Sequence, residues 1–130
     1  MLLDINATSG VPIYRQVLEQ LRRGIVSGQL APGEQLTSVR DLAAELRVNP
    51  MTVSKAYSLL ELDGLVERRR GIGLFVAGLR ERVKEAARRE LMQELFRQAA
   101  SSACQLDMKE EEAVALLREW YRHFSSGRKA

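Results

Sequence analysis

The 130-residue sequence has little of what enzymes, metal-binding proteins and disulfide-bonded proteins rely on: it contains one cysteine and one histidine. The single cysteine, Cys104, excludes a disulfide within the chain and fits a reducing cytoplasm, where we expect it to be a small apolar filler. The single histidine, His123, has no second histidine or cysteine at ligand spacing, so we expect no metal site. Because no serine or cysteine comes with a plausible base, we also expect no catalysis and no cofactor.

Long apolar runs are absent as well, so the sequence predicts no membrane span. The first ten residues lack both the basic start and the apolar stretch of a secretory signal. The net charge is only +3, from 20 Lys and Arg against 17 Asp and Glu. The net charge is therefore weak evidence for a nucleic-acid partner. The positions of the basic side chains along the chain are more informative. They gather between Arg40 and Arg70, while acids such as Glu19, Glu45 and Glu61 can lie elsewhere.

The sequence between Ser38 and Gly64 holds two short amphipathic patterns joined by a tight turn. Ser38 can cap the first helix, Asn49 and Pro50 can begin the second, and Gly64 can end it. Such a pair is a helix-turn-helix, whose second helix can lie in a DNA major groove. If the aliphatic side of the second helix is buried, the exposed side carries Met51, Ser54, Lys55 and Ser58, with Thr52 at its edge. Taken alone, a plain solvated helix face explains this pattern equally well.

A basic hairpin is predicted directly after this helix pair. Residues 65–70 read as a strand leading to an arginine-rich tip, residues 71–73 as the turn, and residues 74–76 as the returning strand. Gly71 and Gly73 permit positive φ angles and a close approach of the backbone to a phosphate. A dinucleotide-binding loop is excluded because there is no third glycine and no helix begins after it. A basic hairpin in this place is the wing of a winged-helix domain.

The segments SVRDLAAEL, VNPMTVSKAYSLLELDGLV and RRRGIGLFV resemble the DNA-binding domain of GntR-type bacterial transcription regulators. The VNPxTVxKAY and Gly-x-Gly-x-Phe-Val signatures are similar to those of the short YtrA-like subgroup. The resemblance covers residues 12–76 and continues more loosely to the C-terminus. It implies phosphate or base contacts for Arg40, recognition-helix contacts for Asn49, Thr52 and Lys55, and the wing turn for Gly71 and Gly73. Four residues depart from the family pattern: Thr37, Arg47, Met51 and Leu74.

Two of these departures affect the interpretation. Arg47 stands where glycine commonly ends the first helix, so it adds charge but must tolerate an awkward backbone. Met51 replaces a more polar residue and can offer only apolar contact, for example to a thymine methyl. We expect phosphate contacts from Arg40, Lys55 and the wing arginines. Base contacts are expected from Asn49, Met51, Thr52 and Ser54. The predicted DNA-binding residues are Ser38, Arg40, Arg47, Asn49, Met51, Thr52, Ser54, Lys55, Arg68, Arg69, Arg70, Gly71 and Gly73.

The remaining chain reads as a lead-in to residue 11, a scaffold helix from Pro12 to Gly28, a very short strand at Gln35–Leu36, and two C-terminal helices. The first of these spans about residues 79–100, and Asp107 with Glu110 suggests a capping box for the second. Two helices of this length cannot bury their apolar faces alone, so we expect them to form a dimer. The alternative is that they fold back on their own winged-helix domain. The predicted dimerisation residues are Leu91, Leu95, Phe96, Leu117, Trp120, Tyr121 and Phe124.

We therefore predict a mainly α fold with a small β-hairpin: a winged helix-turn-helix domain at residues 1–78 and a helical dimerisation region at 79–130. The predicted function is a cytoplasmic, homodimeric regulator, by default a repressor, that binds an inverted-repeat operator in double-stranded DNA. An unknown small-molecule effector has no specified site. A winged-helix protein-interaction module and a nonspecific architectural DNA binder remain as alternatives.

Overall fold

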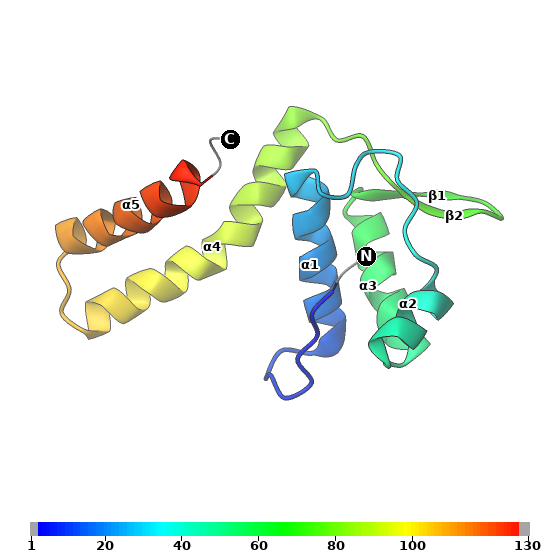
Figure 1. The fold of residues 1–130 in the computed structure, drawn as a ribbon, viewed down its shortest axis with the longest axis horizontal. Helices are drawn as coiled ribbons and strands as arrows, with labels where there is room; N and C mark the ends of the chain where they lie inside the picture. The colour runs from blue at the N-terminus through cyan, green and yellow to red at the C-terminus, as the bar shows by residue number, and fades with distance from the viewer. Residues whose placement is uncertain (1–2, 128–130) are drawn as a thin grey trace. The chain divides into compact units, whose positions relative to one another are not determined.

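The computed structural model describes residues 3–127, in which five helices and one antiparallel hairpin confirm the predicted fold class (Figure 1). The chain divides into two compact units after Arg89. The elements are α1 (Ile13–Ser27), α2 (Val39–Leu46), α3 (Pro50–Leu62), β1 (Val66–Arg69), β2 (Gly73–Val76), α4 (Glu81–Gln105) and α5 (Glu110–Ser126).

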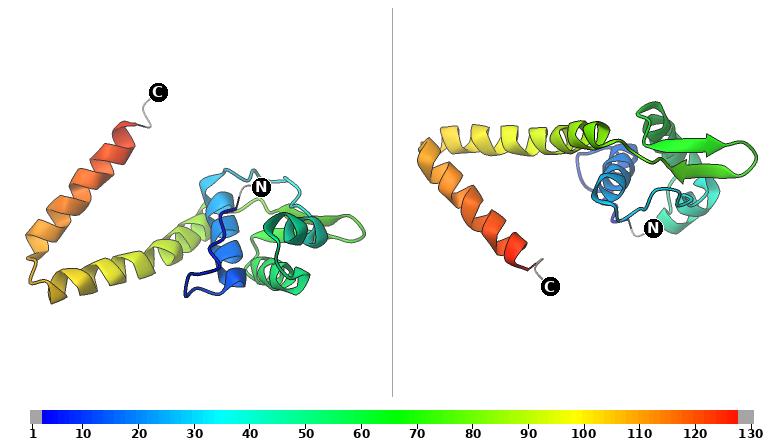
Figure 2. Two further views of the ribbon diagram at one scale, coloured as in Figure 1. Left: turned by 60° about the horizontal axis from the view of Figure 1, so that its bottom comes forward. Right: turned by 90° about the horizontal axis from the view of Figure 1, so that it is seen from above.

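The core of the first unit lies among α1, α2, α3 and the hairpin. The inner face of α1 buries Val17, Leu18, Leu21 and Ile25, and α3 packs against both α1 and α2 (Figure 2). Burying a Leu or Val side chain contributes about 1.5–3 kcal/mol each relative to exposure. α1 ends as predicted at Gly28, whose φ of 86° is left-handed. The largest fully buried side chains are Leu21, Leu42, Leu60, Val17 and Val53.

The helix-turn-helix forms where the caps predict it. The Ser38 hydroxyl accepts a hydrogen bond from the backbone N–H of Asp41, at 3.1 Å, and begins α2. Arg47 ends α2 in the left-handed region at φ 56°, so the predicted awkward backbone is confirmed. The N–H groups of Arg47 and Val48 bond the carbonyls of Ala44 and Ala43, which is a Schellman motif. α3 then begins directly after Asn49.

The hairpin gains a third partner from the linker between α1 and α2. β1 and β2 pair from Val66↔Val76 to Arg69↔Gly73. Gln35 forms a bridge with Phe75, so the predicted very short strand is present as a single bridge. Leu36 donates its N–H to the Leu74 carbonyl at 2.8 Å. The stem of the wing is therefore tied to the linker as well as to itself.

The lead-in before α1 is held along that helix by two glutamines. Gln16 bonds both the N–H and the carbonyl of Asn6, and Gln20 bonds both groups of Asp4. Each glutamine side chain thus makes the pair of hydrogen bonds that the backbone of a neighbouring strand would make. The intervening Ile5 packs against the core.

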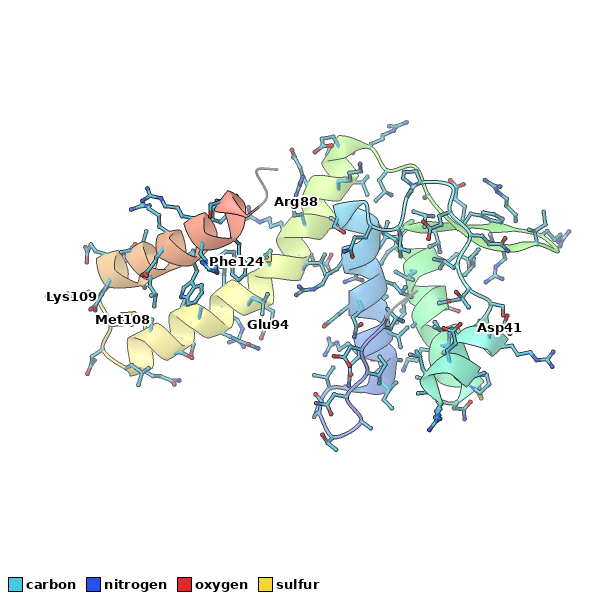
Figure 3. The ribbon with its side chains drawn as sticks, in the orientation of Figure 1. Asp41, Arg88, Glu94, Met108, Lys109 and Phe124 are labelled. Carbon is cyan, nitrogen blue, oxygen red and sulfur yellow. The ribbon has the colours of Figure 1, made fainter. Side chains whose placement is uncertain are left out.

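The second unit contains the C-terminal part of α4 and α5, which diverge from a turn at Met108 and Lys109 (Figures 2 and 3). The prediction that α4 ends near residue 100 is wrong, because it continues to Gln105. The predicted capping box is also wrong: α5 is preceded by Lys109, and Asp107 instead ends α4 at φ 55°. Cys104 is exposed rather than an apolar filler.

Candidate nucleic-acid interface

α3 turns its aliphatic side inward and leaves its polar side exposed, as predicted. The four residues expected inside, Val53, Ala56, Tyr57 and Leu60, are each at most 3% exposed. On the other side Met51 is 78% exposed, and the predicted polar neighbours on that face are exposed too, with Thr52 half-buried. A protruding methionine beside small hydroxyl side chains suits contact with base edges and thymine methyl groups.

The N-terminus of α3 favours a nearby anion. Asn49 Oδ1 accepts a hydrogen bond from the N–H of Met51 at 2.9 Å. This cap uses the oxygen of the carboxamide, so only its amide nitrogen is left to donate outward. The first N–H groups and the helix dipole favour negative charge at this end. Asn49 therefore has a structural role in addition to its predicted base contact.

Lys55 lies beside an aromatic ring that the sequence did not connect with it. Its Nζ is 3.9 Å from the centroid of the Tyr14 ring at the start of α1. Such a cation–π contact contributes about 0.5–1 kcal/mol at an exposed site, so it orients the ammonium without fixing it.

Tyr57 ties α3 to the linker before α2. Its hydroxyl donates to the Thr37 carbonyl at 2.7 Å. Burial, and to a lesser extent the Glu45 carboxylate, raise the pKa of the Tyr57 phenol well above its usual value. The phenol therefore stays protonated and keeps donating at neutral pH.

The three wing arginines have different surroundings. Arg68 forms a paired contact with Glu61, with Nη2 3.0 Å from Oε1 and Nε 3.2 Å from Oε2. The expectation that Glu61 lies away from the basic elements is therefore wrong. The Arg69 guanidinium stacks over Phe75 at 4.0 Å from the ring centroid. All three are exposed, and Arg70 alone of the three lies in the turn beyond the paired strand residues.

The two wing glycines serve different purposes. Gly71 has φ 77°, and a Cβ built there meets nothing within 4 Å, which leaves room for a phosphate. Gly73 has φ 145°, but a Cβ there would lie 2.9 Å from Gln35 Nε2. The space beside Gly73 therefore belongs to Gln35, a residue for which the sequence gives no functional signal.

A cavity of about 260 Å³ opens between the linker, α3 and the wing. It brings together four predicted contacts, Ser38, Ser54, Arg68 and Gly73, with Thr37 and Tyr57 beside them. Hydroxyls and a guanidinium suit a phosphate or sugar oxygen. Arg40 and Arg47 are exposed on α2, outside this cavity.

We name the seven predicted dimerisation residues the α4–α5 apolar face: Leu91, Leu95, Phe96, Leu117, Trp120, Tyr121 and Phe124. No described side chain of α4 or α5 is buried. Trp120 is 53% exposed and Phe124 68%, and His123 packs edge-on against both rings. Figure 3 shows the Phe124 side chain on α5. Large apolar side chains gathered and exposed in this way indicate an interaction surface.

Neither a metal site nor a membrane-spanning helix is found in residues 3–127. No group of three His, Cys, Asp or Glu side chains there could hold a metal ion. In the same residues no helix has the length and apolar character needed to cross a membrane.

Known proteins resemble the chain in sequence and in fold. The family described as "Bacterial regulatory proteins, gntR family" matches residues 13–76, which is α1 through the wing. The HTH-type transcriptional repressor YtrA of Bacillus subtilis (strain 168) is 31% identical over 125 residues, covering 96% of this chain and 93% of that protein. A GntR family transcriptional regulator from Listeria monocytogenes superposes with a TM-score of 0.76 at 29% identity, over 88% of this chain and 98% of that one.

A structure of AraR(DBD) in complex with an operator superposes with a TM-score of 0.51 at 30% identity, over 58% of this chain and 93% of that one. The similar proteins are transcription regulators and repressors, which agrees with the prediction of a non-enzyme. The likeness to YtrA extends through both the winged helix and the C-terminal helices. The chain therefore belongs to the GntR family of bacterial transcription regulators.

Proposed function

We propose that the protein is a cytoplasmic, homodimeric repressor that binds an inverted-repeat operator in double-stranded DNA. The observation that carries this proposal is the bare polar face of α3 beside a basic wing. An AraR(DBD) with a similar fold has been solved with its operator, which supports the same mode of binding.

In this proposal α3 enters the major groove. Met51, Thr52, Ser54 and the Asn49 amide nitrogen face base edges, where methionine contacts a thymine methyl and the others donate or accept hydrogen bonds. The N-terminus of α3 and the hydroxyl-lined cavity receive backbone phosphates. Ser38 and Arg68 act in that cavity, and the other phosphate contacts come from Arg40, Arg47, Lys55, Arg69, Arg70 and Gly71.

The α4–α5 apolar face is the proposed dimer contact, and residues 79–130 the dimerisation region. A twofold pair buries the same face on both protomers. It also fixes two copies of α3 at a set separation, so the half-sites should lie about 10 bp or a multiple of that apart.

The proposal is tested first by selecting bound fragments from random duplex DNA. A specific regulator should enrich a symmetric site and prefer it over random duplex by at least about 10³. If about six phosphates are neutralised, a fourfold rise in salt should lower the affinity by about 10³. Enrichment of no sequence, with tight binding to any duplex, would instead indicate an architectural binder.

Substitutions then test the assignment of residues. Arg40→Ala and Lys55→Ala should each weaken binding to the selected duplex roughly five- to twentyfold, because each removes a phosphate contact. Arg23→Ala, which removes an exposed arginine of α1, is the matched control and should change binding less than about twofold. Parent-like binding by both test variants at moderate salt would refute the assigned roles.

A further inference from the structure

Gln35 contacts the wing at two points. Its backbone forms the bridge with Phe75 at the stem. Its side-chain Nε2 donates a hydrogen bond to the Ile72 carbonyl at 3.1 Å, across 37 residues of sequence. Ile72 lies beyond the last paired residues, Arg69 and Gly73, so this bond acts on the tip rather than on the ladder.

The tip needs such support because the hairpin is short. β1 and β2 have four residues each, and isolated two-stranded hairpins are at best marginally stable in water. The linker reinforces the stem through Leu36 and Leu74. Arg70, Gly71 and Ile72 are exposed, and among the described residues the side-chain hydrogen bond to them comes from Gln35.

The conformation of Gly73 accommodates this contact. A methyl group at Gly73 would approach Gln35 Nε2 to 2.9 Å, whereas one at Gly71 would meet nothing within 4 Å. The missing side chain at Gly73 therefore makes room for the glutamine amide. The two residues form one unit, although they lie far apart in the sequence.

We propose that Gln35 is a positioning residue for DNA binding: its side-chain amide holds the wing tip so that Arg70 meets a backbone phosphate. This inference rests on the DNA-binding function proposed above. A tip that is not held must be ordered when DNA binds, and that ordering lowers the affinity. Gln35 itself need not contact DNA.

The test uses Gln35→Met in the full chain, which keeps the length of the side chain and removes its donor. The Kd for the selected duplex should rise about three- to tenfold, the usual effect of one lost hydrogen bond. The slope of log affinity against log salt should stay that of the parent, because Arg70 still reaches its phosphate once the tip is ordered. The matched control is Gln29→Met, at an exposed glutamine of the same linker, and should bind like the parent.

A double-mutant cycle separates positioning from a general structural role. In an Arg70→Ala background, Gln35→Met should raise the Kd less than about twofold, because the contact it supports is already gone. A full additional loss in that background would overturn the proposal, and so would parent-like affinity of Gln35→Met alone.

NMR of the parent protein without DNA provides an independent measurement. The Gln35 side-chain amide protons should show NOEs to the wing tip and exchange more slowly than those of Gln29. Absence of these NOEs would refute the contact even if Gln35→Met failed to fold. If instead the contact is seen but no duplex is ever enriched, the proposed function fails while the positioning of the tip stands.

Discussion

Arg47 ends α2 with a left-handed backbone that a side chain disfavours. The family pattern has glycine there, and φ is 56° in this chain. The left-handed conformation costs an L-residue about 1–2 kcal/mol, while glycine adds about 0.5–1 kcal/mol of unfolded-state entropy. A phosphate contact of the Arg47 guanidinium would offset this cost in stability.

We predict that Arg47→Gly raises the free energy of unfolding by about 0.5–1 kcal/mol and weakens DNA binding a few-fold. Arg47→Ala is the matched control: it loses the charge and keeps the strain, so it should weaken binding equally without gaining stability. Urea unfolding and a binding titration measure the two effects. A glycine variant less stable than the parent would contradict the strain argument.

The buried Tyr57 phenol makes the free energy of unfolding fall as the pH becomes alkaline. Its burial raises the pKa of the folded-state phenol, while in the unfolded chain the phenol ionises near pH 10. The stabilisation is therefore complete below about pH 10 and is lost above it, by about 1.4 kcal/mol per pH unit.

We predict that Tyr57→Phe loses about 1 kcal/mol at pH 7, because the Thr37 carbonyl loses its donor. Above pH 10 the same variant should lose stability less steeply than the parent. Tyr121→Phe, at a tyrosine that is 73% exposed, should retain the parent slope. Urea unfolding between pH 8 and about 11 measures this, and equal slopes for all three proteins would exclude the assigned cause.

At the scale of elements, Glu61 links α3 to the wing through Arg68. The pair is half-exposed, so salt and water weaken it. A carboxylate beside a phosphate-binding surface also repels DNA. Holding Arg68 and opposing DNA are therefore competing effects of one side chain, and for an exposed pair we expect the repulsion to be larger.

We predict that Glu61→Gln raises affinity for the selected duplex a few-fold at low salt, with less gain at high salt. Glu67→Gln, which removes an exposed wing acid of the same charge, is the control for general electrostatics. A larger gain for Glu61→Gln than for Glu67→Gln would show that release of Arg68 contributes. Weaker binding by Glu61→Gln would mean that the pair instead positions Arg68.

The caps explain how much of the fold could be predicted. Ser38, Asn49 and Gly64 act through bonds to residues within five positions, so local sequence signals locate α2 and α3. The Gln35–Ile72 bond joins distant segments, and no local pattern indicates it. The capping box at Asp107 was predicted wrongly although its local pattern is present. Asp107 has a left-handed backbone and donates its N–H to the Cys104 carbonyl, so it ends α4 instead of beginning α5.

At the scale of the whole molecule, the α4–α5 apolar face exposes large apolar side chains to solvent. Four of its seven side chains, Leu117, Trp120, Tyr121 and Phe124, are half or more exposed. Leu95 and Phe96 are slightly less exposed, and Leu91 is partly buried. Patches of that kind mark protein interaction sites. In a regulator that reads two half-sites, association through this face would couple dimer formation to operator affinity.

We predict that Trp120→Ala and Phe124→Ala each weaken the dimer at least about tenfold, since buried aromatic side chains dominate interface energies. Sedimentation equilibrium should show monomer where the parent is dimeric, and operator affinity should become steeply dependent on protein concentration. Leu106→Ala, at a residue that is 77% exposed in the turn after α4 and outside the proposed face, should leave the dimer intact. Because the winged helix has its own core, binding to a single half-site should survive in both variants. Variants that keep the parent dimer constant would place the dimer contact elsewhere. A parent that sediments as a monomer would refute the proposed dimer and leave the apolar face for another partner.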